Sequence, residues 1–492
     1  MKLMIKVKKP ADEYEIRELT RLFLPEQDFM VVSTDGMDEH SALVIQTEFQ
    51  YEKTETKLVI HSFGRISLTW SFTIQTVTDQ RKQRKNEKNL LKRSIFDLLQ
   101  SWYPRWLPWG ILTGVRPVKI AHEALRREAD PSKAIRHIQE ETLMAEEKAA
   151  LMTEVACRQR EYLGELNPKA VSLYINIPLC PTKCSYCSFA SQSIKSQDDS
   201  ILQDYLQALL REMETVFRML KEKELPIQSL YIGGGTPSVL SAKQLKQFFS
   251  KLSELWDLHA IEEITFEGGR PDTLSKEKLS LLSDYPVHRI SINPQTLHDR
   301  TLQTINRRHT VQDFFSAYED AFKTGLININ VDLIMGLPGE SPEDFQRTLN
   351  KLARLDLKSL TVHSLAMKRT AGLKQQHYRF EWEDHHARSV MQLVYEFAKS
   401  QNLEAYYLYR QKQMLANMEN VGFAKPGKAS LYNILMMEEK QTVLGIGAGA
   451  VSKLVYPLEN RVQRIPGIKD LKIYLERMPV HHEKWRRVFE QL

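Results

Sequence analysis

From residue 170 onwards, short apolar runs alternate along the chain with amphipathic stretches. The runs have the length and the β-branched composition of buried strands, and the stretches between them carry apolar residues at helical spacing. This alternation predicts an α/β fold in which parallel strands are joined by right-handed helical crossovers. Six strands predict a partial (βα)6 barrel rather than a complete barrel. The predicted strands are residues 172–178, 229–235, 262–268, 288–295, 328–336 and 359–367.

The first 80 residues follow a different pattern, in which strand-like runs dominate and predict a small α/β unit. The next segment, residues 81–103, is basic and amphipathic and predicts a helix. We interpret its Lys and Arg residues as a solvated helix face rather than a nucleic-acid surface, because no platform of stacking aromatic residues accompanies them. The predicted strands of this unit are residues 1–7, 28–34, 41–49, 56–62 and 66–76.

The two halves of the chain are connected by two further predicted helices, which run to about residue 165. Asn167 and Pro168 then mark a boundary, because this dipeptide favours a turn. We therefore expect three domains. Residues 1–165 form an N-terminal α/β domain with a helical linker, residues 166–385 form the barrel, and residues 386–492 form a C-terminal lid.

The composition is that of an ordinary globular protein, with 42% hydrophobic and 26% charged residues among 492. The sequence contains no apolar run of 18 residues, so we expect no membrane span. Its first residues become charged at once and lack the apolar region of a signal peptide, which predicts a cytoplasmic location. The formal charge of +6 is small for this length and indicates nothing about partners.

Three of the four cysteines, Cys180, Cys184 and Cys187, lie within eight positions of one another. Prolines beside them favour a loop, on which three thiolates can converge on a cubic iron–sulfur cluster. Three ligands would leave one iron open to a small molecule. A disulfide framework or a zinc site fits less well, because no second pair of cysteines is present. Cys157 lies in a helical pattern and is expected to be a small buried residue.

Glycine and polar residues stand where several of the predicted strands end. The carboxyl ends of parallel strands meet at one edge, so we expect these residues to lie close together. Consecutive glycines permit close backbone approach, although alone they more often mark a tight turn. An acid inside an apolar strand is costly unless it is paired, either structurally or with a ligand. The strand-end candidates are Gly234, Gly235, Thr236, Glu267, Gln295 and Asp332. Arg307 lies twelve residues after Gln295, and its guanidinium fork suits a ligand carboxylate.

Together these motifs resemble the oxygen-independent coproporphyrinogen III oxidase family of radical S-adenosylmethionine enzymes, over roughly residues 170–455. The leader region and parts of the barrel resemble the bacterial dehydrogenase-like branch that has an extra N-terminal domain. The family resemblance is carried by Tyr174 and Tyr186 in YINIPLCPTKCSYCSF, and by YIGGGTPS, NPQT…NRRHT, VDLIMGLPGE and GIGAGAVS. The branch is indicated by PWGILTGVRPVKI, ISINPQTL and YLYRQKQMLANMENVG.

The resemblance implies that Cys180, Cys184 and Cys187 ligate a 4Fe–4S cluster, which cleaves S-adenosylmethionine to a 5′-deoxyadenosyl radical. In that mechanism the radical abstracts hydrogen from propionate side chains of coproporphyrinogen III, and loss of carbon dioxide and one electron leaves vinyl groups. The implied partners are this tetrapyrrole, or haem, and an electron donor such as a flavodoxin. One or two S-adenosylmethionine molecules would be bound by Tyr174, Tyr186, Gly234, Gly235, Thr236, Glu267, Gln295, Arg307, Asp332, His363 and Val451.

Three positions depart from the dehydrogenase pattern or from its relatives. Phe189 stands where dehydrogenases carry a further cysteine, and phenylalanine there is typical of the haem-chaperone branch. That branch usually has a His-Asn pair where this chain has Tyr432 and Asn433, and Asn176 replaces a usual histidine. The leading prediction is oxidative decarboxylation of coproporphyrinogen III. The alternatives are a haem-binding or haem-delivery protein that retains the cluster, and a radical enzyme with another substrate.

The aromatic-rich run in the C-terminal part allows two interpretations. Its tyrosines, Tyr406, Tyr407 and Tyr409, together with Arg410, suit a flat ligand that carries carboxylates. Alternatively, alternate residues of a strand would pack on the barrel. We favour ligand binding, because this region should close the mouth of the barrel.

Overall fold

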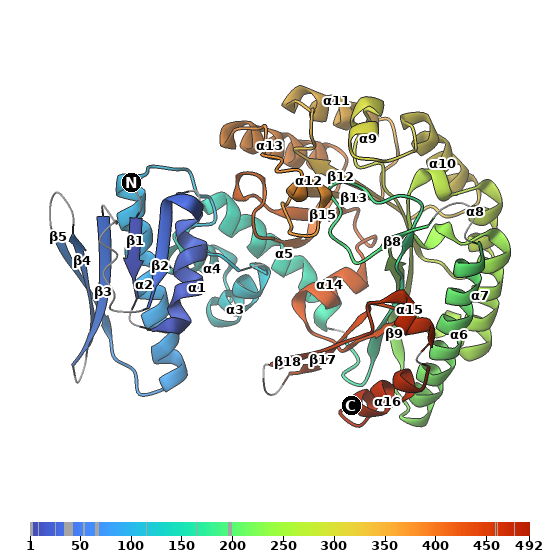
Figure 1. Cartoon of the computed structure of the whole chain (residues 1–492), viewed down its shortest axis with the longest axis horizontal. Coiled ribbons are helices and arrows are strands. Elements are labelled where there is room, and N and C mark those ends of the chain that lie inside the picture. The colour runs from blue at the N-terminus through green and yellow to red at the C-terminus, as the bar shows by residue number, and fades with distance from the viewer. Residues whose placement is uncertain are drawn as a thin grey trace. The chain divides into compact units, whose positions relative to one another are not determined.

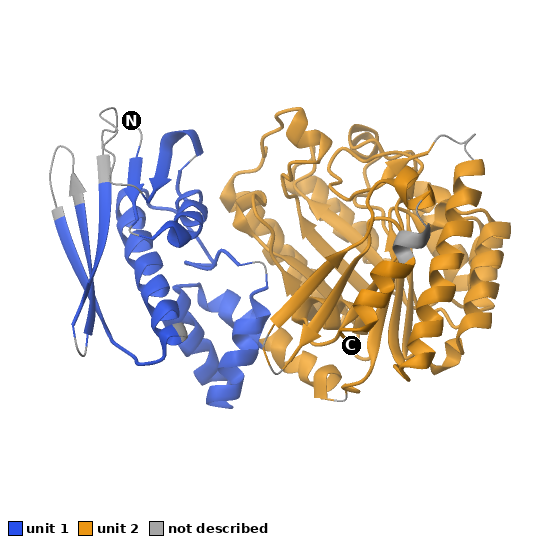
Figure 2. Cartoon of the chain, turned by 60° about the horizontal axis from the view of Figure 1, so that its bottom comes forward, with its two compact units in different colours: residues 1–153 blue, residues 154–492 orange. Residues whose placement is uncertain are grey.

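The computed structural model of the protein forms two compact units, residues 1–153 and residues 154–492 (Figure 2). Helix α5, Glu146–Gly164, begins in the first unit and ends in the second. The structure describes residues 3–7, 9–24, 26–33, 43–52, 55–63, 68–114, 116–164, 166–194, 199–457, 459, 461–476 and 478–492.

The first unit contains a five-stranded sheet in the order β2-β1-β3-β4-β5. Strand β1 pairs in parallel with β2 and β3, and β3, β4 and β5 form antiparallel pairs. All five predicted strands are confirmed, although residues 1, 2, 34, 41, 42, 66 and 67 of them lie outside the described part of the chain. The strands are β1 Leu3–Lys6, β2 Phe29–Val32, β3 Leu43–Tyr51, β4 Glu55–Phe63 and β5 Leu68–Gln75.

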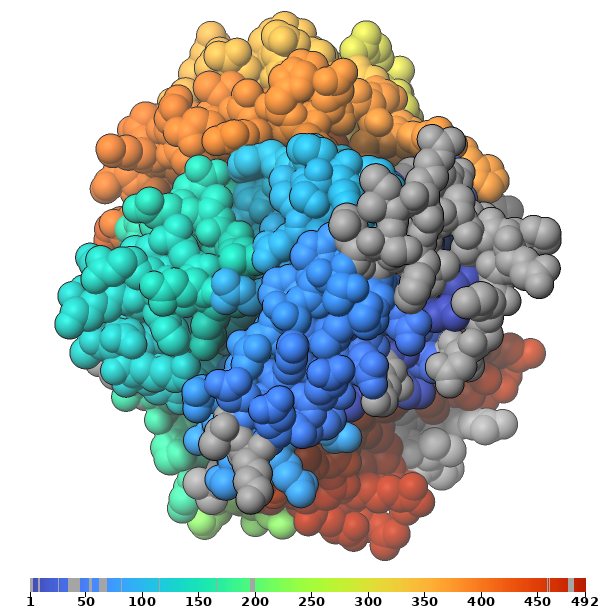
Figure 3. Space-filling view, turned by 90° about the vertical axis from the view of Figure 1, so that its left-hand side faces the viewer, coloured from blue at the N-terminus to red at the C-terminus, as the bar shows by residue number. Residues whose placement is uncertain are grey.

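The predicted basic helix is α2, Gln80–Trp102, whose apolar side packs into the core beneath the sheet. Several of its basic residues contact acidic or carbonyl groups of the same unit. Lys88 lies 2.7 Å from Glu15, and Arg93 donates a 2.6 Å hydrogen bond to the carbonyl of Glu140. In Figure 3 the teal residues of α3, Val118–Glu128, and α4, Pro131–Thr142, lie beside the blue residues of the same unit. The other helices are α1 Pro10–Thr20, α3 Val118–Glu128 and α4 Pro131–Thr142.

The second unit is built on an 11-stranded sheet in the order β14-β15-β13-β12-β11-β10-β9-β6-β16-β17-β18. Its centre contains the six predicted parallel strands as direct neighbours, which confirms the predicted partial (βα)6 barrel. The two outermost strands, β14 and β18, each pair on one side only, so the sheet stays open. The central strands are β6 Val171–Ile177, β9 Ile227–Gly234, β10 Glu263–Gly269, β11 Arg289–Ile292, β12 Ile329–Met335 and β13 Ser359–Ser364.

Much of residues 386–492, which we expected to be a lid, extends the barrel sheet at both of its edges. Strand β16 pairs in parallel with β6, and β15 pairs antiparallel with β13. This segment therefore belongs to the same compact unit as the barrel. The added strands are β14 Glu404–Tyr409, β15 Asn420–Ala424, β16 Val443–Ile446, β17 Val451–Tyr456 and β18 Arg461–Pro466.

Helices follow the parallel strands and cover the outer side of the sheet (Figure 1). Several begin at a capping residue. Ser341 accepts a hydrogen bond from the backbone of Asp344, whose side chain accepts one in return, and Pro342 occupies the first turn. These helices are α6 Asp199–Glu222, α7 Ala242–Leu255, α8 Lys276–Ser283, α9 Asp299–Thr304, α10 Val311–Lys323, α11 Pro342–Leu352 and α13 Asp384–Ser400.

A buried carboxylate on α6, Glu212, joins three parts of the C-terminal region. It accepts hydrogen bonds from the amide of Gly447 at 2.8 Å, the hydroxyl of Tyr474 at 2.7 Å and the indole of Trp485 at 2.8 Å. Within the described residues, no helix is long and apolar enough to cross a membrane. The remaining helices are α12 Gly372–Gln375, α14 Leu431–Glu438, α15 Leu471–Glu476 and α16 Met478–Phe489.

Candidate active site

The three clustered cysteines lie on the loop that follows β6. The loop is closed by two short paired strands, β7 Leu179–Cys180 and β8 Gln192–Ser193, and the amide of Cys187 donates a 3.1 Å hydrogen bond to the carbonyl of Cys184. All three thiols are free and partly buried. The structure thus presents three reduced sulfur ligands on one short loop at the carboxyl end of a barrel strand.

The chemistry of this loop fits an iron–sulfur cluster better than a single metal ion. Among the described residues, no three His, Cys, Asp or Glu side chains are placed to share one ion. A cubic cluster instead offers a separate iron to each thiolate. Burial, followed by the negative charges of Cys184 and Cys180, raises the pKa of Cys187 to about 11 in the metal-free chain. Cationic irons would remove this obstacle to ionisation.

Arg307 lies inside the site rather than at its surface. Its guanidinium donates to the hydroxyl of Tyr186 at 2.9 Å, the carbonyl of Gly269 at 3.0 Å and the carbonyl of Asn293 at 2.7 Å. It therefore joins the cysteine loop to the ends of β10 and β11. We expected the guanidinium of Arg307 to bind a ligand carboxylate. In the structure, most of its N–H groups instead donate hydrogen bonds to other groups of the protein.

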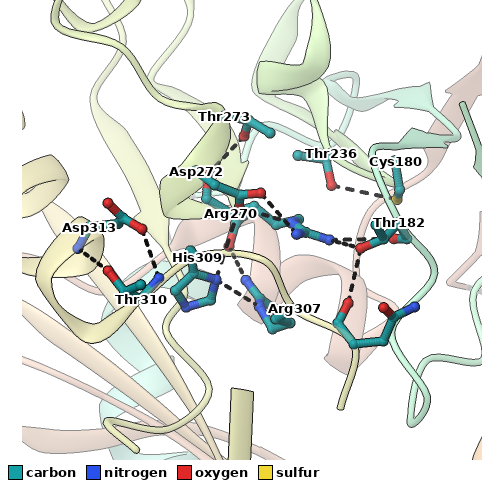
Figure 4. A network of polar contacts seen from close by, with 12 residues as sticks. Cys180, Thr182, Thr236, Arg270, Asp272, Thr273, Arg307, His309, Thr310 and Asp313 are labelled. Atoms are coloured by element: carbon teal, nitrogen blue, oxygen red, sulfur yellow. Dashed lines mark hydrogen bonds and ion pairs between the residues drawn. The ribbon is translucent and has the colours of Figure 1, made fainter. Parts of the chain in front are cut away.

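A second buried arginine, Arg270, also connects the cysteine loop to the end of β10 (Figure 4), and the sequence analysis did not predict it as a site residue. It binds both carboxylate oxygens of Asp272, at 3.0 and 2.9 Å, and donates to the hydroxyl of Thr182 on the cysteine loop. Thr182 in turn donates to the carbonyl of Asn306 at 3.0 Å. Its position could have indicated this role, because Arg270 directly follows the Glu-Gly-Gly end of a predicted strand.

The glycines after β9 allow the chain to pack against the cysteine loop. The amides of Gly235 and Thr236 donate to the carbonyls of Ile177 and Leu179, at 2.8 and 2.9 Å. A Cβ atom at Gly235 would lie 2.6 Å from the Leu179 carbonyl and 2.9 Å from the sulfur of Cys180. Gly235 thus makes room for the chain's own loop, and the Thr236 hydroxyl lies 3.5 Å from that sulfur (Figure 4).

Glu267, at the end of β10, is surrounded by neutral donors. The hydroxyl of Tyr231 and the amide of Asn293, the latter at 2.7 Å, both donate to its carboxylate. Burial and the nearby charge of Asp332 raise the pKa of Glu267 to about 7. Glu267 therefore gains and loses its proton close to neutral pH.

Asp332, on β12, has the opposite behaviour. Its own burial acts to raise its pKa, but hydrogen bonds from His363, Asn330 and Thr361 and the charge of His363 lower it below the ordinary value. The imidazole of His363 lies 3.5 Å from this carboxylate, and its other nitrogen lies 3.1 Å from the hydroxyl of Tyr409. Two carboxyl groups whose pKa values are shifted in opposite directions thus lie in the same site.

Gln295 combines an unusual backbone with an unsatisfied side chain. Its φ is +69°, a conformation that costs free energy outside glycine, and the backbone bonds to Asp332 and Ile334 hold it there. Its buried carbonyl oxygen Oε1 finds no hydrogen-bond partner within the described part of the chain. Such an acceptor beside the two carboxyl groups suits a ligand donor.

Tyr174 contacts its neighbours through its ring. It stacks on Tyr231 and Tyr432 with centroid distances of 6.1 and 6.2 Å, and its hydroxyl lies 3.3 Å from Asn176. Val451 begins β17, next to the backbone of Gly445. The structure therefore gathers the strand-end candidates around the cysteine loop, with Val451 on the adjoining C-terminal strand.

The C-terminal tyrosines follow the strand interpretation. Tyr406 and Tyr407 lie on β14 and are 3% and 5% exposed, so they cannot present a face to a flat ligand. Arg410 is also buried. Our expectation of a ligand-binding aromatic surface was wrong for these residues, because the strand pairs with β15 and packs into the barrel. Tyr409, in contrast, lies beside His363 in the candidate site.

Comparisons with known proteins agree with this geometry. Residues 174–352 match the Radical SAM superfamily. The oxygen-independent coproporphyrinogen-III oxidase-like protein HemZ of Bacillus subtilis is 37% identical over 412 residues, which are 83% of this chain and 82% of that protein. The heme chaperone HemW of Lactococcus lactis is 32% identical over 315 residues, which are 64% of this chain and 74% of that protein.

Among solved structures, the fold is similar to that of coproporphyrinogen III oxidase (HemN) from Escherichia coli. The TM-score is 0.52 at 23% identity, over 66% of this chain and 73% of that one. The superfamily's cofactors are a 4Fe–4S cluster and S-adenosylmethionine, and the three free thiols on one loop fit the cluster. The chain belongs to the oxygen-independent coproporphyrinogen III oxidase family within the radical S-adenosylmethionine superfamily.

Proposed function

We propose that the protein catalyses the oxygen-independent oxidative decarboxylation of coproporphyrinogen III to protoporphyrinogen IX in the cytoplasm. The observation that carries this proposal is the polar cluster of Glu267, Asp332 and Gln295, which Asn293 and Arg307 connect to the loop of three free thiols. The name of the HemZ relative, an oxygen-independent coproporphyrinogen-III oxidase-like protein, supports the same substrate class. Each propionate that becomes a vinyl group loses one hydrogen atom, one molecule of carbon dioxide and one electron.

The chain's own residues would bind and orient the reactants. Cys180, Cys184 and Cys187 would hold the cluster, which with S-adenosylmethionine supplies the abstraction of a hydrogen atom. Gln295 would accept a hydrogen bond from the cofactor, and Asp332 would bind its cationic amino group.

In its protonated form Glu267, whose pKa is raised to about 7, would donate to an acceptor such as a ribose oxygen. The remaining proposed contacts come from Tyr174, Gly234, Thr236, His363 and Val451. Tyr186 and Arg307 would fix the loop through their 2.9 Å hydrogen bond.

A second candidate function is haem binding or haem delivery. Phe189 follows the last cysteine by two positions and is 69% exposed, and heme chaperones are among the relatives. Against this candidate, the segment at Tyr432 and Asn433 has no histidine and lies in the first turn of α14, where the carboxylate of Glu263 caps the backbone.

An anaerobic assay would test the proposal. Reconstituted protein is incubated with dithionite, S-adenosylmethionine and coproporphyrinogen III, and chromatography follows 5′-deoxyadenosine and the tetrapyrrole. We expect protoporphyrinogen IX to accumulate with the nucleoside, and a Cys184→Ala variant to form neither. Nucleoside formation without tetrapyrrole conversion would reject this substrate. A stoichiometric absorbance change on adding haem would then support the second candidate.

A further inference from the structure

Three chain segments meet at the outer side of the cysteine loop. The loop itself, residues 181–194, is joined to residues 305–310 by hydrogen bonds from the amide of Ser185 to the Ile305 carbonyl at 3.1 Å and from the Asn306 side chain to the Lys183 carbonyl at 2.9 Å. The third segment is residues 366–380.

Residues 366–380 contact the same loop at two points. The amide of Leu373 donates to the Ser185 carbonyl at 2.8 Å, and the hydroxyl of Thr370 donates to the Ser188 carbonyl at 3.1 Å. The three segments therefore form one surface around the thiols, which we call the loop surface.

The loop surface is basic and carries no acid. Its three segments contain no Asp or Glu, although these types make up 62 of the chain's 492 residues. With Arg307 buried in the site, the other basic side chains are all exposed. They are Lys183, Arg308, Lys368, Arg369, Lys374 and Arg379.

An exposed aromatic side chain stands within this basic surface. Phe189 is 69% exposed, the largest exposed fraction among the big apolar side chains of the described residues. A protruding aromatic residue surrounded by charge is the composition of a protein-binding patch, in which the ring provides buried area and the charged rim provides steering.

We propose that the loop surface is the docking site of an acidic one-electron carrier protein that reduces the cluster. This inference rests on the proposed function, because reductive cleavage of S-adenosylmethionine consumes one electron per molecule. The carrier is oxidised by one electron and the cluster is reduced by one. A carrier docked here approaches the loop that bears all three thiols, and its acidic surface would match the six exposed cations.

Two matched pairs of charge reversals test the docking site. Arg308→Glu with Lys374→Glu reverses two cations of the loop surface. Lys243→Glu with Lys246→Glu makes the same change of charge on exposed residues of α7, outside the three segments. The holoprotein is assayed for 5′-deoxyadenosine formation, with either reduced flavodoxin, reduced ferredoxin or dithionite as the electron source.

In the loop-surface variant we expect the KM for flavodoxin or ferredoxin to be about tenfold higher than in the parent protein. We also expect this KM to depend less on salt concentration, because attraction between opposite charges governs the encounter. Its rate with dithionite should equal that of the parent protein, and the α7 variant should match the parent in every assay. Phe189→Ser should raise the KM for the carrier without changing the salt dependence.

Two results would overturn the proposal. One is an unchanged KM for both carriers in the loop-surface variant. The other is a raised KM for coproporphyrinogen III with dithionite as reductant, which would assign the surface to substrate carboxylates. Since the readout is cleavage of S-adenosylmethionine, a failure of the tetrapyrrole reaction would be seen separately.

Discussion

Replacing Arg270 by alanine should detach the cysteine loop from the end of β10. The side chain is 3% exposed and makes a two-point ion pair with Asp272 and a hydrogen bond to Thr182. Removing one partner of a buried pair costs roughly 3–5 kcal/mol. The Asp272 side chain is 19% exposed, so we expect the lower end, about 3 kcal/mol. A change of that size alters the balance between the ordered and the detached loop about 100-fold.

The assay for this prediction measures iron and sulfide per chain after anaerobic reconstitution, together with urea unfolding. Arg270→Ala should lose most of its iron. A matched control is Arg289→Ala, since Arg289 is equally buried, 2% exposed, but begins β11 and bonds to Lys428 and Asn330 instead. The control should lose stability and keep its iron. Equal iron contents in the two variants would refute a positioning role for Arg270.

Three further predictions concern the same site. Gly235→Ala should prevent cluster incorporation, because its Cβ would lie 2.6 Å from the Leu179 carbonyl, whereas Gly164→Ala has free space and should reconstitute normally; iron analysis would decide. The protonated Glu267 stabilises the fold below pH 4.5, and this contribution is lost as the pH rises to about 7, because its pKa is raised in the folded state. The unfolding free energy of the parent protein should therefore fall between pH 4.5 and about 7, and Glu267→Gln should remove this fall. Identical pH profiles of urea unfolding in the two proteins would contradict this prediction. Asn176→His should cost about 1–3 kcal/mol through overpacking, because Asn176 Oδ1 already lies against Gly234, and unchanged urea unfolding would count against this.

The parallel core and the cysteine loop were predictable because their signals are local. Each central strand is a short apolar run followed by an amphipathic helix, and the three thiols are neighbours in sequence. Strand ends on a parallel sheet share one edge, so the meeting of Glu267 with Asp332 followed from topology.

Contacts between distant segments were not predictable in this way. Asn176 donates to the carbonyl of Ala448 and accepts at its own carbonyl from Tyr205 at 2.5 Å, and nothing in the local pattern around it indicates either partner. The tyrosines of β14 gave a misleading signal, because alternating aromatic residues occur equally in packed strands and in ligand surfaces. Pairing between strands far apart in the sequence leaves no mark in either segment alone, as for Ile175 on β6 and Ile446 on β16, which are 271 residues apart.

The pairing of β16 with β6 also sets the order in which the site can be completed during synthesis. The cysteine loop leaves the ribosome early, but one edge of β6 stays open until residues 443–446 arrive to pair with it. Until then the nascent chain exposes an apolar strand edge, the kind of edge that attracts non-native pairing. Such distant pairing also slows folding. The barrel sheet is therefore complete around β6 only after residue 446 has been synthesised.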